Sequence, residues 1–90
     1  MNRERRKQIE EVISKLESLQ GEIELMKDDI QEIADMEQGY LDNMPESLQN
    51  SSNFERSSEA IDDLGYAIEE IENLENSIQE AISYLESSKE

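Results

Sequence analysis

The stretch YLDNMPESLQ, residues 40–49, contains the only proline in the 90-residue chain. Proline lacks the backbone donor that a helix needs and restrains the residue before it to extended conformations, so it interrupts a helix. Asn43 suits the cap of a short turn around Pro45, because Glu46 then occupies the capping-box position. The polar run QNSSN (49–53) is typical of turns. The stretch therefore predicts a corner between two helices.

Before the corner, apolar residues recur at alternating intervals of three and four. In heptad notation, position a holds Ile9, Leu16, Ile23 and Ile30, and position d holds Val12, Leu19, Met26 and Ile33. A sustained repeat of this kind predicts a helix with a coiled-coil-like seam, which we expect over residues 3–41. Further apolar residues widen this face at positions e and g: Ile13, Ala34, Leu41 and Met36.

After the corner, Ser52 and Glu55 match a capping box, which starts a second helix near residue 53. Its apolar spacing slips between Ile71 and Leu74, and such a slip broadens the apolar face. The stripe consists of Ile61, Leu64, Ile68, Ile71, Leu74, Ile78, Ile82 and Leu85. We expect this helix over residues 53–88, the corner over 42–52, and one helical-hairpin domain over 1–90.

Two helices of similar length joined by a short corner favour an all-α antiparallel hairpin. Only 34% of the residues are apolar, so a large core is excluded, and two helices cover only part of each other's stripe. We therefore expect the seam residues to serve as core or as oligomer contacts. A homo-oligomer, with a dimer that forms a four-helix bundle, is favoured over a monomer or a complex with another protein.

Cysteine and histidine are absent, which removes thiolate nucleophiles and the commonest general base and metal ligand. The acidic pairs Asp28-Asp29 and Asp62-Asp63 lack the alternating ligands of a calcium loop. No stretch approaches the roughly 18 apolar residues of a membrane span. We expect no catalytic residue, metal site, cofactor or membrane contact, and hence a cytoplasmic protein that is not an enzyme.

The charge is strongly acidic, with 24 acidic and 8 basic residues and a net charge of −16. Such a chain repels nucleic acid and attracts basic surfaces, so we expect a partner protein with a basic surface and no direct DNA binding. Regularly spaced carboxylates on a helix can imitate phosphates; alternatively, they only keep the chain soluble. The candidate partner surface comprises Asp28, Asp62, Asp63, Tyr66, Glu69 and Glu70.

Half of the basic residues lie in the N-terminal RERRK segment, at Arg3, Arg5, Arg6 and Lys7. Residues 8–90 carry 23 acidic and 4 basic side chains, which opposes nucleic-acid binding by this segment. Three interpretations of these cations remain open: pairing with nearby glutamates, a mobile N-terminus, or contact with the acidic body of a second copy.

The arrangement of NRERRKQIEEVISKLESL (2–19), DNMPESLQ (42–49) and EAIDDLGYAIEEIENLENSIQEAI (59–82) resembles short acidic proteins of bacteriophages and prophages. The resemblance implies a phage origin and the cytoplasm of an infected bacterium, and it supplies no site residues. It favours a non-enzymatic protein that blocks a host protein, such as a nucleic-acid-handling defence factor. An assembly role based on self-association, or the capture of a small nucleotide signal by several RERRK segments of an oligomer, remains open.

Overall fold

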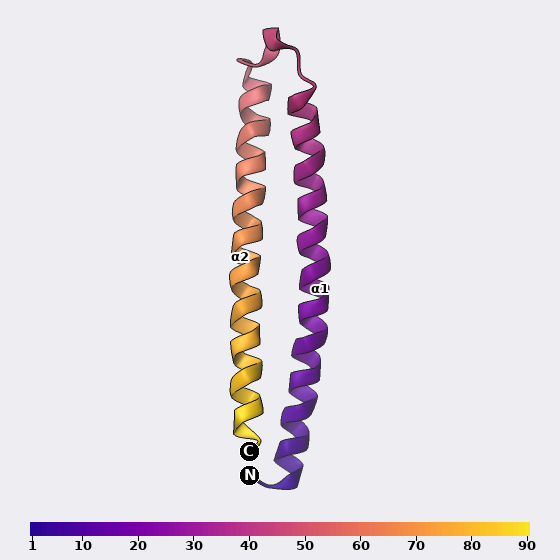
Figure 1. Ribbon diagram of the computed structural model, residues 1–90, viewed down its shortest axis with the longest axis vertical. Helices are drawn as coiled ribbons and strands as arrows, with labels where there is room; N and C mark the ends of the chain where they lie inside the picture. Colours follow the sequence, from indigo (N-terminus) through magenta and orange to yellow (C-terminus); the bar gives the residue numbers. More distant parts are fainter. The chain divides into compact units, whose positions relative to one another are not determined.

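The computed structural model describes all residues, 1–90, and is helical apart from its corner and chain ends (Figure 1). Helix α1 spans Arg3–Asp42, a single 3₁₀ turn η1 spans Glu46–Leu48, and helix α2 spans Ser52–Ser88. The two long helices pack as a hairpin, which confirms the predicted fold class. Each helix boundary lies within one residue of the position expected from the heptads and the proline.

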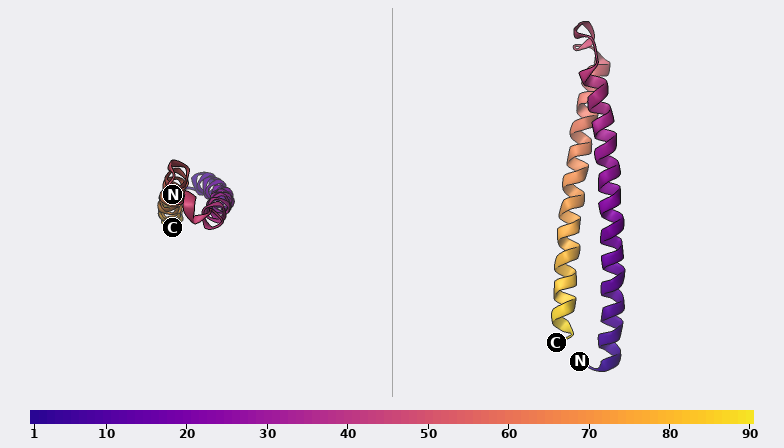
Figure 2. Two further views of the ribbon diagram at one scale, coloured as in Figure 1. Left: turned by 90° about the horizontal axis from the view of Figure 1, so that it is seen from above. Right: turned by 45° about the vertical axis from the view of Figure 1, so that its right-hand side comes forward.

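The chain forms two compact units, each built from a segment of α1 and a segment of α2. The end unit comprises Met1–Leu25 and Ile71–Glu90, and the corner unit comprises Met26–Glu70. Both chain termini lie at the same end of the end unit (Figure 1). Two further views show the α1 and α2 segments of each unit side by side (Figure 2).

The core of the end unit consists of isoleucines from both helices. Ile13 and Ile23 of α1 form a buried cluster with Ile78 and Ile82 of α2. Partly buried residues complete the cluster: Ile9, Leu16, Ile71 and Leu85. Full burial of an aliphatic side chain contributes about 1.5–3 kcal/mol, so these residues are the main stabilising contacts of this unit.

A side-chain cap closes the N-terminus of α1. The Asn2 Oδ1 accepts a hydrogen bond from the backbone N–H of Arg5 at 2.8 Å. This bond satisfies one of the first donors of the helix, which have no partner within it. This cap was not among the predicted features, although Asn followed by a charged helical run is a recognisable signal for one.

The prediction that Asn43 caps the turn around Pro45 is wrong. The backbone nitrogen and the side-chain Nδ2 of Asn43 both donate to the carbonyl oxygen of Gly39, at 3.1 and 2.9 Å. Asn43 therefore closes the end of α1, because its side-chain amide adds a second donor to a carbonyl oxygen of the last helical turn. Pro45 itself precedes η1, with φ −58° and ψ 145° and no side-chain cap.

The start of α2 lies one residue before the predicted capping box. The Ser51 Oγ, not that of Ser52, accepts a hydrogen bond from the backbone N–H of Phe54, at 3.2 Å. Ser51 can do so because its own N–H donates to the Leu48 carbonyl at 3.0 Å, which fixes it outside the helix. No residue of the corner has a positive φ, so the turn needs no glycine.

Candidate interaction surfaces

Helix α1 contacts α2 through its a and e positions. Its buried residues are Ile13, Ile23, Ala34 and Leu41, of which only Ile23 is at position a. The other a positions Ile9, Leu16 and Ile30 are half-buried. The e position also supplies Gln20, whose Nε2 lies 3.4 Å from the Oε1 of Gln79. The contact of α1 inside the chain is thus rotated away from position d.

The d positions of α1 form an exposed apolar stripe. This d stripe consists of Val12, Leu19, Met26, Ile33 and Tyr40, one residue in every seven. Each of these side chains is between 40% and 52% exposed, whereas Ile13 and Ile23 are 4% exposed. Val12 and Leu19 belong to the end unit, and the other members to the corner unit. Half of the predicted α1 seam is therefore exposed in the single chain.

Most of the predicted α2 seam lies in the interface between the helices. Ile78 and Ile82 are buried, and Leu74 is exposed. The remaining members are half-buried: Ile61, Leu64, Ile68, Ile71 and Leu85. Beside this seam, α2 carries a row of mostly small residues at seven-residue spacing, which we call the small stripe: Ala60, Ala67, Leu74 and Ala81.

In each unit, the d stripe and the small stripe lie on the same flank of the helix pair. In the end unit, the Gln20–Gln79 bond marks the polar flank, and helical steps of about 100° place Leu19 and Leu74 on the other one. In the corner unit, Tyr40 shares a shallow hollow with Asn53, which lies seven residues before Ala60. The d stripe of α1 thus has the mostly small residues of α2 on its own flank.

The polar flank of the end unit is lined by carboxylates. A hollow of about 420 Å³ is bordered by Glu17, Gln20, Gln79 and Glu86, among others. The Lys89 Nζ lies 3.0 Å from Glu86 Oε2 and 3.9 Å from Glu10 Oε1. The hydrogen bond to Glu86, with the attraction of both carboxylates, raises the pKa of Lys89 above its usual value despite partial desolvation.

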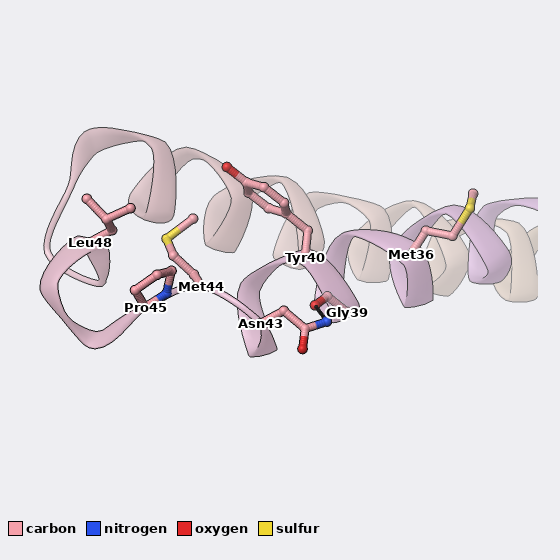
Figure 3. Close-up of a pocket in the computed structure, with 7 residues that line it drawn as sticks. All are labelled: Met36, Gly39, Tyr40, Asn43, Met44, Pro45 and Leu48. Atoms are coloured by element: carbon pink, nitrogen blue, oxygen red, sulfur yellow. Dashed lines mark hydrogen bonds between the residues drawn. The ribbon is translucent and has the colours of Figure 1, made fainter.

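The corner unit carries an apolar hollow of about 470 Å³ (Figure 3). The Met44 side chain lies between Leu48 and Tyr40, and the Asn43 amide turns toward Gly39 (Figure 3). The complete lining is Met36, Gly39, Tyr40, Asn43, Met44, Pro45 and Leu48. Sequence reasoning did not predict this hollow, although apolar residues at every fourth position, 36, 40, 44 and 48, are a signal for it.

The predicted partner surface lies in the corner unit and is exposed throughout. Asp28 comes from α1, whereas Asp62, Asp63, Tyr66, Glu69 and Glu70 lie on consecutive turns of α2. Residues 26–70 contain 13 acidic and 2 basic side chains, a net charge of −11. No three carboxylates are close enough together to hold a metal ion. Tyr66, 62% exposed, does not line the corner hollow.

The N-terminal cations Arg3, Arg5, Arg6 and Lys7 are exposed and lie in the first turns of α1. None of them forms an ion pair within the chain, and Glu10 is paired with Lys89 instead. Pairing of these cations with nearby glutamates, one of the three open alternatives, is therefore not present. Cations at the N-terminus of a helix face the positive end of its dipole, an unfavourable position without a partner.

Neither long helix contains a segment apolar enough to cross a lipid bilayer. No protein-family model, curated protein or solved structure matches the chain. The proposed function therefore rests on the interaction surfaces described above.

Proposed function

We propose that the protein is a non-enzymatic binding protein that acts as a homodimer, in which the d stripes of two chains pack into a four-helix bundle. The observation that carries this proposal is the exposure of the d stripe, 40–52% at every member. A strict heptad of large apolar side chains is the pattern by which helices associate, and a chain gains nothing from it as a solvent-facing row.

The accessible surface supports a second helical layer. The chain exposes 6,794 Å². A folded monomer of 10.4 kDa exposes about 5,400 Å², so the excess is roughly 1,400 Å² per chain. A specific dimer typically buries about 800 Å² per partner, and the excess is sufficient for that.

The small stripe gives the second layer room to approach. Alanines at 60, 67 and 81 lie on the same flank as the d stripe in their units. Small side chains let helix backbones come close, while large ones beside them fill the space between layers. Alternation of large and small side chains across a flank favours a packed helical layer over a loose apolar contact.

The dimer is tested by placing charge in the d stripe. Leu19→Glu with Ile33→Glu inserts two carboxylates into the proposed interface, where burial without a partner is strongly unfavourable. The control, Ser18→Glu with Gln31→Glu, adds the same charge at exposed neighbouring positions. Light scattering should give twice the chain mass of 10.4 kDa for the wild type and the control, and the chain mass for the stripe variant. A wild type that is monomeric at a chain concentration of about 100 µM refutes the dimer.

We further propose that the acidic surface of the corner unit binds a basic groove of a nucleic-acid-handling host protein and blocks it. What supports this is the net charge of −11 on residues 26–70 together with the exposure of Asp62, Asp63, Glu69 and Glu70. Carboxylates on a rigid helix present fixed negative charge as a phosphate backbone does, so the two compete for the same arginines and lysines. The resemblance to phage proteins makes a bacterial host the system in which to test it.

The blocking function is tested by competition with DNA. Heparin-retained DNA-binding proteins of a bacterial host are loaded with a fluorescent duplex, and the protein is added as competitor. The wild type should displace the duplex, with a half-inhibitory concentration that rises about tenfold or more between low and high salt. Asp62→Asn, Asp63→Asn, Glu69→Gln and Glu70→Gln together should abolish displacement. As a control, four exposed carboxylates of the end unit are neutralised instead, which should reduce displacement less: Glu11, Glu22, Glu80 and Glu90. Equal losses of displacement in the two variants, or displacement that does not depend on salt concentration, contradict the proposal.

A further inference from the structure

We infer that the basic N-terminal segment of one chain docks at the corner of a second copy, so that the α1 helices of the dimer run antiparallel. The segment is Arg3, Arg5, Arg6 and Lys7, and its receiving surface is the apolar corner hollow together with Asp42 and Glu46, which adjoin the lining residues in sequence. This inference rests on the proposed dimer and adds to it the orientation of the chains and the occupant of the hollow.

The charge on the two units is unequal, and this decides the orientation. The corner unit has a net charge of −11, whereas residues 1–25 and 71–90 together have a net charge of −5. A dimer with both corners at the same end places the two most acidic surfaces together, and like charges in contact oppose association. The antiparallel arrangement brings the N-terminal cations of each chain to the more acidic unit of the other.

The corner hollow matches an arginine or lysine side chain in both of its parts. Its lining of Met36, Tyr40, Met44, Pro45 and Leu48 suits the aliphatic stem of such a side chain. Tyr40, 52% exposed, offers an aromatic face to a guanidinium. Asp42 and Glu46 flank the Asn43–Pro45 segment in sequence, and both are exposed. The Asp42 Oδ1 accepts a hydrogen bond from Gln38 at 2.9 Å, which holds this carboxylate at the end of α1.

The N-terminal cations also occupy an unfavourable position on their helix. They occupy the first turns of α1, at the unfavourable end of its dipole, and none has an ion pair within the chain. A contact with carboxylates of a second copy removes this conflict at both ends of a symmetric dimer. The same two sets of residues meet twice, as an isologous interface requires.

Tyr40 connects this contact to the proposed interface. It is the last member of the d stripe and also lines the corner hollow. In an antiparallel pair of α1 helices, Met26, the middle member of the d stripe, lies near the two-fold axis, and Tyr40 lies opposite the N-terminal part of the partner helix. Within the corner unit, Tyr40 thus belongs both to the d stripe and to the proposed charged contact.

A charge exchange tests the orientation. The first variant carries Arg3→Glu, Arg5→Glu and Arg6→Glu; the second carries Asp42→Lys and Glu46→Lys. Each variant alone places like charges in both end contacts. The Kd of its dimer should therefore be about tenfold higher than that of the wild type. An equimolar mixture restores opposite charges at both contacts and should form a heterodimer within about threefold of the wild-type Kd, as measured by native mass spectrometry and sedimentation.

A matched control separates local pairing from total charge. Glu22→Lys with Glu72→Lys makes the same change in net charge at exposed positions distant in the helices from both corner and N-terminus. This control keeps the wild-type end contacts and should dimerise with itself, but mixed with the first variant it should not form a heterodimer within about threefold of the wild-type Kd. Heterodimer formation equal to that with the second variant overturns the inference. Circular dichroism confirms that each variant is helical. A dimeric wild type without rescue by the second variant overturns only the orientation, and a monomeric wild type overturns the proposed dimer with it.

Discussion

Val12 and Ile13 are adjacent in α1, yet Ile13 is 4% exposed and Val12 is 45% exposed. One helical step of about 100° turns Ile13 into the isoleucine cluster with Ile78 and Ile82 and leaves Val12 on the d stripe. The pair thus separates the contact that holds α1 on α2 from the contact that we propose between chains.

Alanine substitutions at these two residues should have different effects on folding. In the Leu19→Glu/Ile33→Glu background, where the dimer is disrupted, Ile13→Ala should lower the free energy of unfolding by about 2–4 kcal/mol, because it leaves a cavity in the core. Val12→Ala should change it by less than about 0.5 kcal/mol. Urea denaturation followed by circular dichroism gives both values; equal losses show that position d is buried within the chain.

The cap of α2 provides a second matched pair. Ser51→Ala removes the acceptor of the Phe54 N–H and should lower the free energy of unfolding by about 1 kcal/mol. Ser52→Ala should change it by less than about 0.5 kcal/mol, because Ser52 is exposed at the first helical position. Denaturation of both variants decides between them, and a larger loss at Ser52 indicates that α2 begins one residue later.

The sequence was sufficient to predict the hairpin but not the choice of its inner face. The heptads and Pro45 determine where helices form and end, since both act over a few residues of chain. Position a was expected in the seam, and Ile23 is buried there. Whether e or d joins it depends on the competition of Ile13, Ala34 and Leu41 with the d residues for α2, which spacing alone does not rank.

The corner shows the same limit at the scale of single hydrogen bonds. Asn43 can serve a turn that follows it or a helix that precedes it, and in the structure its side chain donates backward to the Gly39 carbonyl. Ser51 and Ser52 are both competent caps, and the choice follows from the bond between Ser51 N–H and the Leu48 carbonyl. Local side-chain chemistry therefore predicts the presence of caps better than their register.

The closure of α1 by Asn43 leads to a third prediction. Asn43→Asp removes the Nδ2 donor and places a carboxylate near the Gly39 carbonyl at the negative end of the helix dipole. We expect the free energy of unfolding to fall by about 1–2 kcal/mol, more than for Asn43→Ala, which only removes the hydrogen bond. Asn50→Asp is the control, because it adds the same charge at an exposed corner residue. Equal losses in Asn43→Asp and Asn50→Asp attribute the effect to corner charge rather than to the hydrogen bond.

The ion pairs of Lys89 predict the behaviour of the fold at alkaline pH. The hydrogen bond to Glu86, together with the attraction of Glu86 and Glu10, raises the pKa of Lys89 in the folded chain. A group whose pKa is higher in the folded state stabilises that state fully below its unfolded pKa, here about 10.4, and loses this contribution as the pH rises through the folded pKa. The free energy of unfolding should therefore fall more steeply in the wild type than in Lys89→Met between about pH 9 and 12. Lys89→Arg retains its charge over this range, so the pH dependence of its unfolding free energy should resemble that of Lys89→Met, while its stability at about pH 7 equals that of the wild type. If the stability of Lys89→Met declines as steeply as that of the wild type, the pair with Glu86 does not contribute to folding.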